Sequence, residues 1–139
     1  MRKAQPAPFS LSKLKMKESP IFTKTFDLLA WLLPETIKFP RQHRFVLAEA
    51  VQRMALLFQE QIIDAGMAED PLPRLHDADI TLIKVRTYLR LARQLELLKF
   101  NQYEHGARLV DEVGRLLGGW IKGAKEEQAT GEGKRKGRR

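Results

Sequence analysis

The sequence predicts an all-α fold, an up-down-up-down antiparallel four-helix bundle. Apolar residues recur at helical spacing in four stretches, and no stretch shows the sustained alternation of a β-strand. The connections between these stretches are short, which makes successive helices antiparallel. The bundle is expected over residues 20–123, between a basic N-terminal arm at 1–19 and a disordered basic C-terminal tail at 124–139.

The first helix is predicted over residues 20–38. Ser19 is placed to cap it, and Pro20 fits the first turn, where its missing N–H is not needed. Pro34 should kink or tighten the last turn because it cannot donate a hydrogen bond, and Pro40 ends the segment. The expected apolar stripe consists of Phe22, Phe26, Leu29, Leu32 and Leu33.

The second helix is predicted over residues 41–65. Gly66 is expected to end it in a left-handed conformation. The following loop, residues 67–73, contains Pro71 and Pro73 and should not continue the helix. The expected apolar stripe consists of Leu47, Val51, Met54, Phe58 and Ile62.

The third helix, predicted over residues 74–98, is apolar in almost every direction. One stripe consists of Leu82, Val85, Leu89 and Ala92. A second stripe, roughly on the opposite side, consists of Ile80, Leu91, Leu95 and Leu98. A single bundle core covers only one face of a helix. The second stripe therefore predicts contact with another chain or a partner.

The fourth helix is predicted over residues 102–124. Asn101 and Glu104 have the spacing of a capping box, with Asn in place of Ser or Thr. Gly114, Gly118 and Gly119 lie inside this helix and indicate close approach of another helix rather than a phosphate loop. The expected core stripe consists of Tyr103, Ala107, Val110, Val113, Leu117, Trp120 and Ile121.

Charge is unevenly distributed along the chain. The 139 residues include 25 Lys and Arg against 17 Asp and Glu, a formal net charge of +8, and the excess lies in the first 19 and last 18 residues. In the bundle, both helix junctions at one end are basic and the turn at the other end is acidic. The basic pole consists of Lys38, Arg41, His43, Arg44, Arg93 and Lys99. The acidic pole consists of Glu60, Asp64, Glu69, Asp70 and Asp77.

The sequence lacks the residues that several kinds of chemistry require. The chain has no cysteine, which excludes disulfides, thiol nucleophiles and cysteine-based zinc sites. Its longest apolar run, residues 28–33, is too short to span a bilayer, and no signal core follows the N-terminus. The three histidines fall in no metal-ligand motif. His76 with Asp77 and Asp79 is interpreted as a solvated helix start. The sequence also contains no phosphate-loop motif. We therefore expect a cytoplasmic non-enzyme without catalytic residues, metal or cofactor.

Arg86, Arg90 and Arg93 are the candidate binding residues. At i, i+4 and i+7 they lie on one side of the third helix, where three guanidinium groups repel one another unless an anion lies across them. Phosphate is the expected anion. The alternatives are a solvated face or pairing with acids on a neighbouring helix. Aromatic residues do not interleave the basic ones in the sequence, so backbone contact is expected rather than base stacking.

Five segments carry a family resemblance in order along the chain. They are 26–34 (FDLLAWLLP), 38–45 (KFPRQHRF), 89–93 (LRLAR), 102–104 (QYE) and 114–122 (GRLLGGWIK). This set resembles the accessory variability determinant (Avd) of diversity-generating retroelements, within the wider S23-like four-helix-bundle family. Ala48 and Ala50 stand where relatives tend to have a glycine and a basic residue.

The resemblance implies a non-enzymatic protein that forms a barrel-like homopentamer with a basic surface. Such a protein binds the retroelement reverse transcriptase and, through the phosphate backbone, RNA and DNA, supporting mutagenic retrohoming from the template-repeat RNA. The implied nucleic-acid-binding residues are Arg86, Arg90, Arg93, Arg41 and Arg44. The alternative is an S23-type structural bundle with no retroelement role, and a neighbouring reverse transcriptase gene with paired repeats would distinguish the two.

Overall fold

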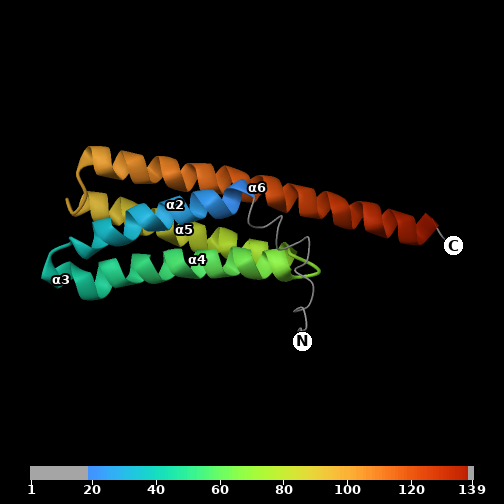
Figure 1. Ribbon diagram of the computed structural model, residues 1–139, viewed down its shortest axis with the longest axis horizontal. Coiled ribbons are helices and arrows are strands. Elements are labelled where there is room, and N and C mark those ends of the chain that lie inside the picture. The colour runs from blue at the N-terminus through green and yellow to red at the C-terminus, as the bar shows by residue number, and fades with distance from the viewer. Residues whose placement is uncertain (1–18, 138–139) are drawn as a thin grey trace, which may run out of the picture.

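The computed structural model describes residues 19–137, with side chains to residue 131, and contains no strand within that range (Figure 1). The predicted N-terminal arm, apart from Ser19, lies outside the described residues. The elements are α2 (Pro20–Ile37), α3 (Arg41–His43), a π-helical segment (Arg44–Ala48), α4 (Glu49–Met67), α5 (Leu72–Gln94) and α6 (Phe100–Gly137).

Four long helices form the predicted antiparallel bundle. α2 packs against α4 and α6, and α5 packs against the same two helices. The α2–α3 and α5–α6 junctions lie at one end, and the α4–α5 turn lies at the other, where α6 continues past it (Figure 1). The core includes Leu28, Leu32, Val51, Phe58, Ile62, Leu75, Val85, Val110, Val113 and Leu117. None of the described helices combines the length and apolar character needed to cross a membrane.

The apolar face of α2 is rotated from the predicted one. Phe26, expected in the core, is 65% exposed, whereas Leu28 is buried. The sequence is ambiguous here because apolar residues occur on several sides of this helix. Ser19 precedes α2 but makes no side-chain capping hydrogen bond. Pro34 stays inside the helix, and the last turn is tightened as predicted, since Lys38 N–H donates to the carbonyl three residues back.

The second helical run differs from the prediction at both ends. It begins with α3 and a π-helical segment, a wider turn that changes the phase of the following side chains. It then passes through Gly66 to Met67, and no described glycine has a positive φ. α5 starts at Leu72, two residues earlier than predicted, because Pro73 fits its first turn and the Asp70 carboxylate accepts a hydrogen bond from Leu72 N–H at 3.2 Å.

α5 ends four residues before the predicted boundary in a left-handed turn. Glu96 has φ of 61°, its N–H donates to Arg93 O at 2.9 Å, and Leu97 N–H donates to Ala92 O at 2.8 Å. These are the two hydrogen bonds of a Schellman motif, which usually has glycine at the left-handed position. The sequence prediction missed this stop because a glutamate occupies it. Leu98, assigned to the second apolar stripe, is consequently buried after the turn.

α6 begins two residues before its predicted start. The side chain of Gln102 accepts a hydrogen bond from Lys99 N–H at 2.8 Å, which is half of a capping box. Gln102 rather than Glu104 therefore holds the third position of the helix.

α6 also extends far beyond its predicted end. The structure has helix to Gly137 where a disordered tail was expected from residue 124. Lys125 to Ala129 are good helix formers, and extending an existing helix requires no new nucleation. Gln128 Nε2 also donates to Asp70 Oδ1 at 2.8 Å, which fastens this part of α6 to the α4–α5 turn.

Candidate nucleic-acid interface

Arg86, Arg90 and Arg93, here called the arginine stripe, lie on α5, and Arg86 has a partner on the neighbouring helix α6. Arg86 forms an ion pair with Asp111 of α6, with 3.0 Å between the nitrogen and the carboxylate oxygen. The two side chains are 45% and 59% exposed. Pairing with an acid on a neighbouring helix, one of the alternatives for the stripe, is therefore the arrangement adopted by Arg86.

Arg93 supports the α5–α6 turn. It is partly buried, and its guanidinium donates to the backbone carbonyl of Leu98 at 3.0 Å. The same guanidinium lies over the ring of Phe100, 5.8 Å from the ring centroid. An alanine at this position would consequently disturb the turn as well as remove a charge.

Arg90 is the exposed, unpaired member of the stripe. Within residues 19–131, neither Arg90 nor Arg115 of α6 forms an ion pair. Asp111, the acid four residues before Arg115 on α6, pairs with Arg86. Arg115 lines a hollow of about 370 Å³ on this seam together with Arg86 and Asp111. It is a further candidate phosphate contact, and only the packing of α6 on α5 reveals it.

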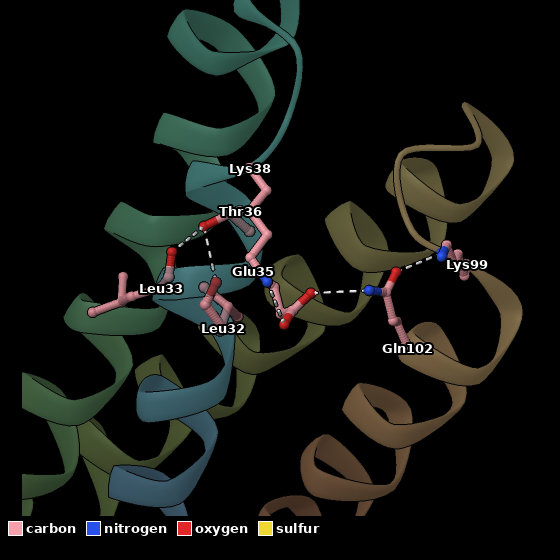
Figure 2. A network of polar contacts seen from close by, with 7 residues as sticks. All are labelled: Leu32, Leu33, Glu35, Thr36, Lys38, Lys99 and Gln102. Carbon is pink, nitrogen blue, oxygen red and sulfur yellow. Dashed lines mark hydrogen bonds and ion pairs between the residues drawn. The ribbon is translucent and has the colours of Figure 1, made fainter.

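At the basic pole, a polar network joins the two helix junctions (Figure 2). Glu35 near the end of α2 pairs with Lys38 at 3.5 Å and accepts a hydrogen bond from Gln102 Nε2 at 3.3 Å. Gln102 in turn accepts the N–H of Lys99. Next to it, the hydroxyl of Thr36 donates to the carbonyls of the preceding turn. The network brings the cations of both junctions onto one end of the molecule.

Arg41 and Arg44 lie at this same end. Both are exposed, and neither forms an ion pair in the described part of the chain. They follow the buried Phe39, which anchors the junction between α2 and α3. The five arginines singled out from the sequence thus fall into three groups, namely one paired, one built into a turn, and three open to solvent.

Two outer faces of the protomer expose apolar side chains. The outer face of α5 exposes Ile80, Ile83, Leu91 and Leu95, which confirms the second stripe apart from Leu98. The outer faces of α2 and α4 expose Phe26, Ile37, Leu56, Ile63 and Met67. These two faces lie on different helices and differ in composition.

The glycines of α6 have unequal surroundings. A Cβ added at Gly118 or Gly119 would meet nothing within 4 Å, so the close helix approach predicted for them does not occur among the described residues. The close approach occurs at Gly106, where a Cβ would lie 2.5 Å from the Trp31 ring. This position was not singled out from the sequence because the contact depends on how α2 packs on α6.

The histidines do not gather into a metal site. Among the described residues, no group of three His, Asp or Glu side chains lies close enough to hold a metal ion. His105 packs edge-to-face with Trp31 at 5.8 Å, and His76 is exposed at the start of α5.

Comparison with known proteins identifies a family but no individual relative. A family model described as bAvd-like matches residues 21–124, from the first turn of α2 to the part of α6 that packs on the bundle. No curated protein matches the chain.

Proposed function

Because this chain belongs to the bAvd-like family, whose members are helical accessory domains, we propose that it is the non-enzymatic accessory protein of a diversity-generating retroelement. In this proposal it works in the cytoplasm, binding the retroelement reverse transcriptase and the template-repeat RNA or its cDNA in support of mutagenic retrohoming. The family match over residues 21–124 is the observation that carries the proposal, and the cationic surfaces supply a means of binding nucleic acid.

Binding to nucleic acid would use the phosphate backbone. Arg41, Arg44 and Arg90 are exposed and unpaired in the described chain, so they can contact phosphates without losing a protein partner. Arg86 would have to exchange Asp111 for a phosphate. Arg93 would act chiefly by holding the α5–α6 turn. No base-reading element is involved, so sequence preference should be weak.

The proposal includes assembly into a barrel-like homopentamer. A closed ring of identical chains needs two different surfaces on each chain, because every contact is head-to-tail. The exposed face of α5 and the exposed faces of α2 and α4 meet this requirement. Leu91→Glu should dissociate the assembly in light scattering, whereas Thr130→Glu, on the exposed end of α6, should not. A monomeric wild type at micromolar concentration would contradict this part.

The nucleic-acid part is tested by the salt dependence of binding. The logarithm of the affinity should fall with the logarithm of salt concentration by about 0.9 per phosphate contact on duplex DNA and about 0.7 on single strands. Arg41→Ala, Arg44→Ala and Arg90→Ala should lower both the affinity and this slope. Arg74→Ala is the matched control, since Arg74 is exposed on α5 and forms no ion pair with the other residues that the structure describes, but lies at the opposite end.

Three results would count against the proposal. If the four arginine variants lose affinity equally, binding is a general charge effect and not a property of these surfaces. If deletion of residues 125–139 abolishes binding while the arginine variants retain it, the tail is the binding element. Failure of the purified protein to retain the reverse transcriptase encoded beside it would favour the alternative, a structural S23-type bundle.

A further inference from the structure

The basic pole exposes aromatic rings among its cations, which differs from the expectation that aromatic and basic residues are not interleaved. Phe45 is 74% exposed, and Phe100 is 60% exposed. Phe45 directly follows Arg44, and Phe100 directly follows Lys99. Single exposed apolar side chains are normal on a protein surface, but two aromatic rings at one strongly charged end are a feature typical of a binding surface.

The two rings belong to one end of the molecule. Phe45 follows the α2–α3 junction and Phe100 begins α6, and both junctions lie at the same end of the bundle (Figure 1). The hydrogen-bonded chain through Glu35 and Gln102 links these junctions directly (Figure 2). Phe45 and Phe100, which are 55 positions apart in the sequence, therefore lie at one end of the molecule.

The ring of Phe100 is held before any ligand arrives. The guanidinium of Arg93 lies 5.8 Å from its centroid, and that guanidinium is fixed by its hydrogen bond to the carbonyl of Leu98. Because Arg93 is partly buried and so anchored, the ring needs little ordering when a base stacks on it. Arg93 thereby orients the Phe100 ring in addition to supporting the α5–α6 turn.

Phe45 is presented by the π-helical segment. Within this segment Leu47 and Ala48 are buried, whereas Phe45 and Val46 are exposed, at 74% and 75%. π-helical turns are rare and occur frequently at functional sites. Here the turn places an aromatic and an aliphatic side chain in solvent beside Arg41 and Arg44.

The charge of this surface favours a polyanion. Lys38, Arg41, Arg44 and Lys99 are all exposed. Two nearby acids already have protein partners. Glu35 is only 18% exposed, pairs with Lys38 and accepts a hydrogen bond from Gln102. Glu49 pairs with Arg53 at 3.5 Å. Glu96, in the left-handed turn, is the acid without an ion pair at this end of the described chain.

We propose that the basic pole is a stacking platform for single-stranded nucleic acid, on which Phe45 and Phe100 stack unpaired bases while the surrounding cations contact phosphates. The inference rests on the proposed function and specifies the strand form that this end binds. Base stacking on aromatic rings tolerates any sequence, and it requires base faces that a duplex hides. Single strands are therefore preferred over duplexes at this pole.

The experiment compares Phe45→Leu and Phe100→Leu with the wild type and with Phe45→Trp and Phe100→Trp in the full-length protein. Leucine keeps an apolar side chain but removes the aromatic face, whereas tryptophan keeps an aromatic face. The tryptophan variants are therefore the matched controls. Fluorescence anisotropy would measure binding of a short oligothymidylate and of a mixed-sequence duplex, and circular dichroism would confirm that each variant remains helical.

Loss of either pole ring should weaken oligothymidylate binding by about 5- to 100-fold, the range observed for one stacked base. Duplex binding and the salt slope should stay unchanged, because the phosphate contacts remain. Phe45→Trp and Phe100→Trp should retain binding. A 5-iodouracil in the oligonucleotide should crosslink to the peptides that contain Phe45 and Phe100.

Failure of this inference is distinguishable from failure of the proposed function. If the leucine variants bind oligothymidylate as the wild type does, while Arg41→Ala and Arg90→Ala still weaken binding, the stacking platform is refuted and the backbone interface stands. If the leucine variants lose the reverse transcriptase but keep the oligonucleotide, the pole is a protein-docking surface and stacking is likewise refuted. If the wild type binds neither probe, both proposals fail.

Discussion

Asp111→Asn should increase nucleic-acid affinity, because it releases Arg86 from its only ion pair in the described chain. The pair spans α5 and α6 at 3.0 Å with both side chains substantially exposed. An exposed pair of this kind contributes at most about 1 kcal/mol. The ion pair with Asp111 must be broken, at the cost of that free energy, before Arg86 can bind a phosphate. Removing the carboxylate should therefore raise the affinity by up to about 5-fold for each Arg86 that contacts the ligand.

The same substitution should steepen the salt dependence. A newly available guanidinium adds about 0.9 to the slope on duplex DNA and about 0.7 on single strands. The free energy of unfolding should fall by no more than about 1 kcal/mol. Anisotropy titrations at several salt concentrations measure the first effect, and urea denaturation measures the second.

Glu112→Gln provides the matched control. Glu112 is the next residue of α6, and it forms a cross-helix pair with Lys24 at 3.6 Å on the opposite seam. The Glu112→Gln substitution removes one negative charge, as Asp111→Asn does, but it frees no member of the arginine stripe. In an Arg86→Ala background, most of the gain from Asp111→Asn should disappear. Equal gains from Asp111→Asn and Glu112→Gln, or a loss of affinity with Asp111→Asn, would refute the reasoning.

Three further pairs of substitutions test the packing. Thr25→Val should raise the free energy of unfolding by about 1 kcal/mol, because the Thr25 hydroxyl is buried without a hydrogen-bond partner in the described chain. Thr36→Val should lower it by about 1–2 kcal/mol, because the Thr36 hydroxyl donates to backbone carbonyls of the preceding turn and accepts a hydrogen bond from Gln52. Glu96→Gly should stabilise the α5–α6 turn by about 0.4–1 kcal/mol, and Glu96→Gln should not, if backbone conformation rather than charge is the cause. Gly106→Ala should cost about 1–3 kcal/mol relative to Gly123→Ala, since only the first added methyl meets an indole ring. Urea denaturation measures each, and an opposite order within any pair contradicts the structure.

The sequence was sufficient to predict the four helices and their antiparallel order. The stripes through Val51, Phe58, Val85 and Val113 repeat at helical spacing, and these residues are buried. Burial of a repeated apolar face depends mainly on local periodicity, so it is visible in one sequence. The helix ends were less predictable, since Glu96 occupies a left-handed position that sequence patterns assign to glycine.

The candidate site was only partly predictable. Helical spacing brought Arg86, Arg90 and Arg93 together, but it could not show that they have different partners. The pairing of Arg86 with Asp111 depends on the register of α5 against α6, and the position of Arg93 depends on where α5 stops. The partners of a side chain on a neighbouring helix depend on how the two helices pack, and the spacing of residues along the sequence does not reveal that packing.

The length of α6 has an electrostatic consequence for the acidic pole. Gln128 is fastened to Asp70, and the helix continues nine residues further to Gly137. At 1.5 Å per residue this overhang is about 13 Å long. The distance exceeds the Debye length of about 8 Å in physiological salt. The end of the α6 backbone therefore lies beyond the screened field of the carboxylates at the α4–α5 turn, so a polyanion that approaches this end of the helix is not repelled by the acidic pole.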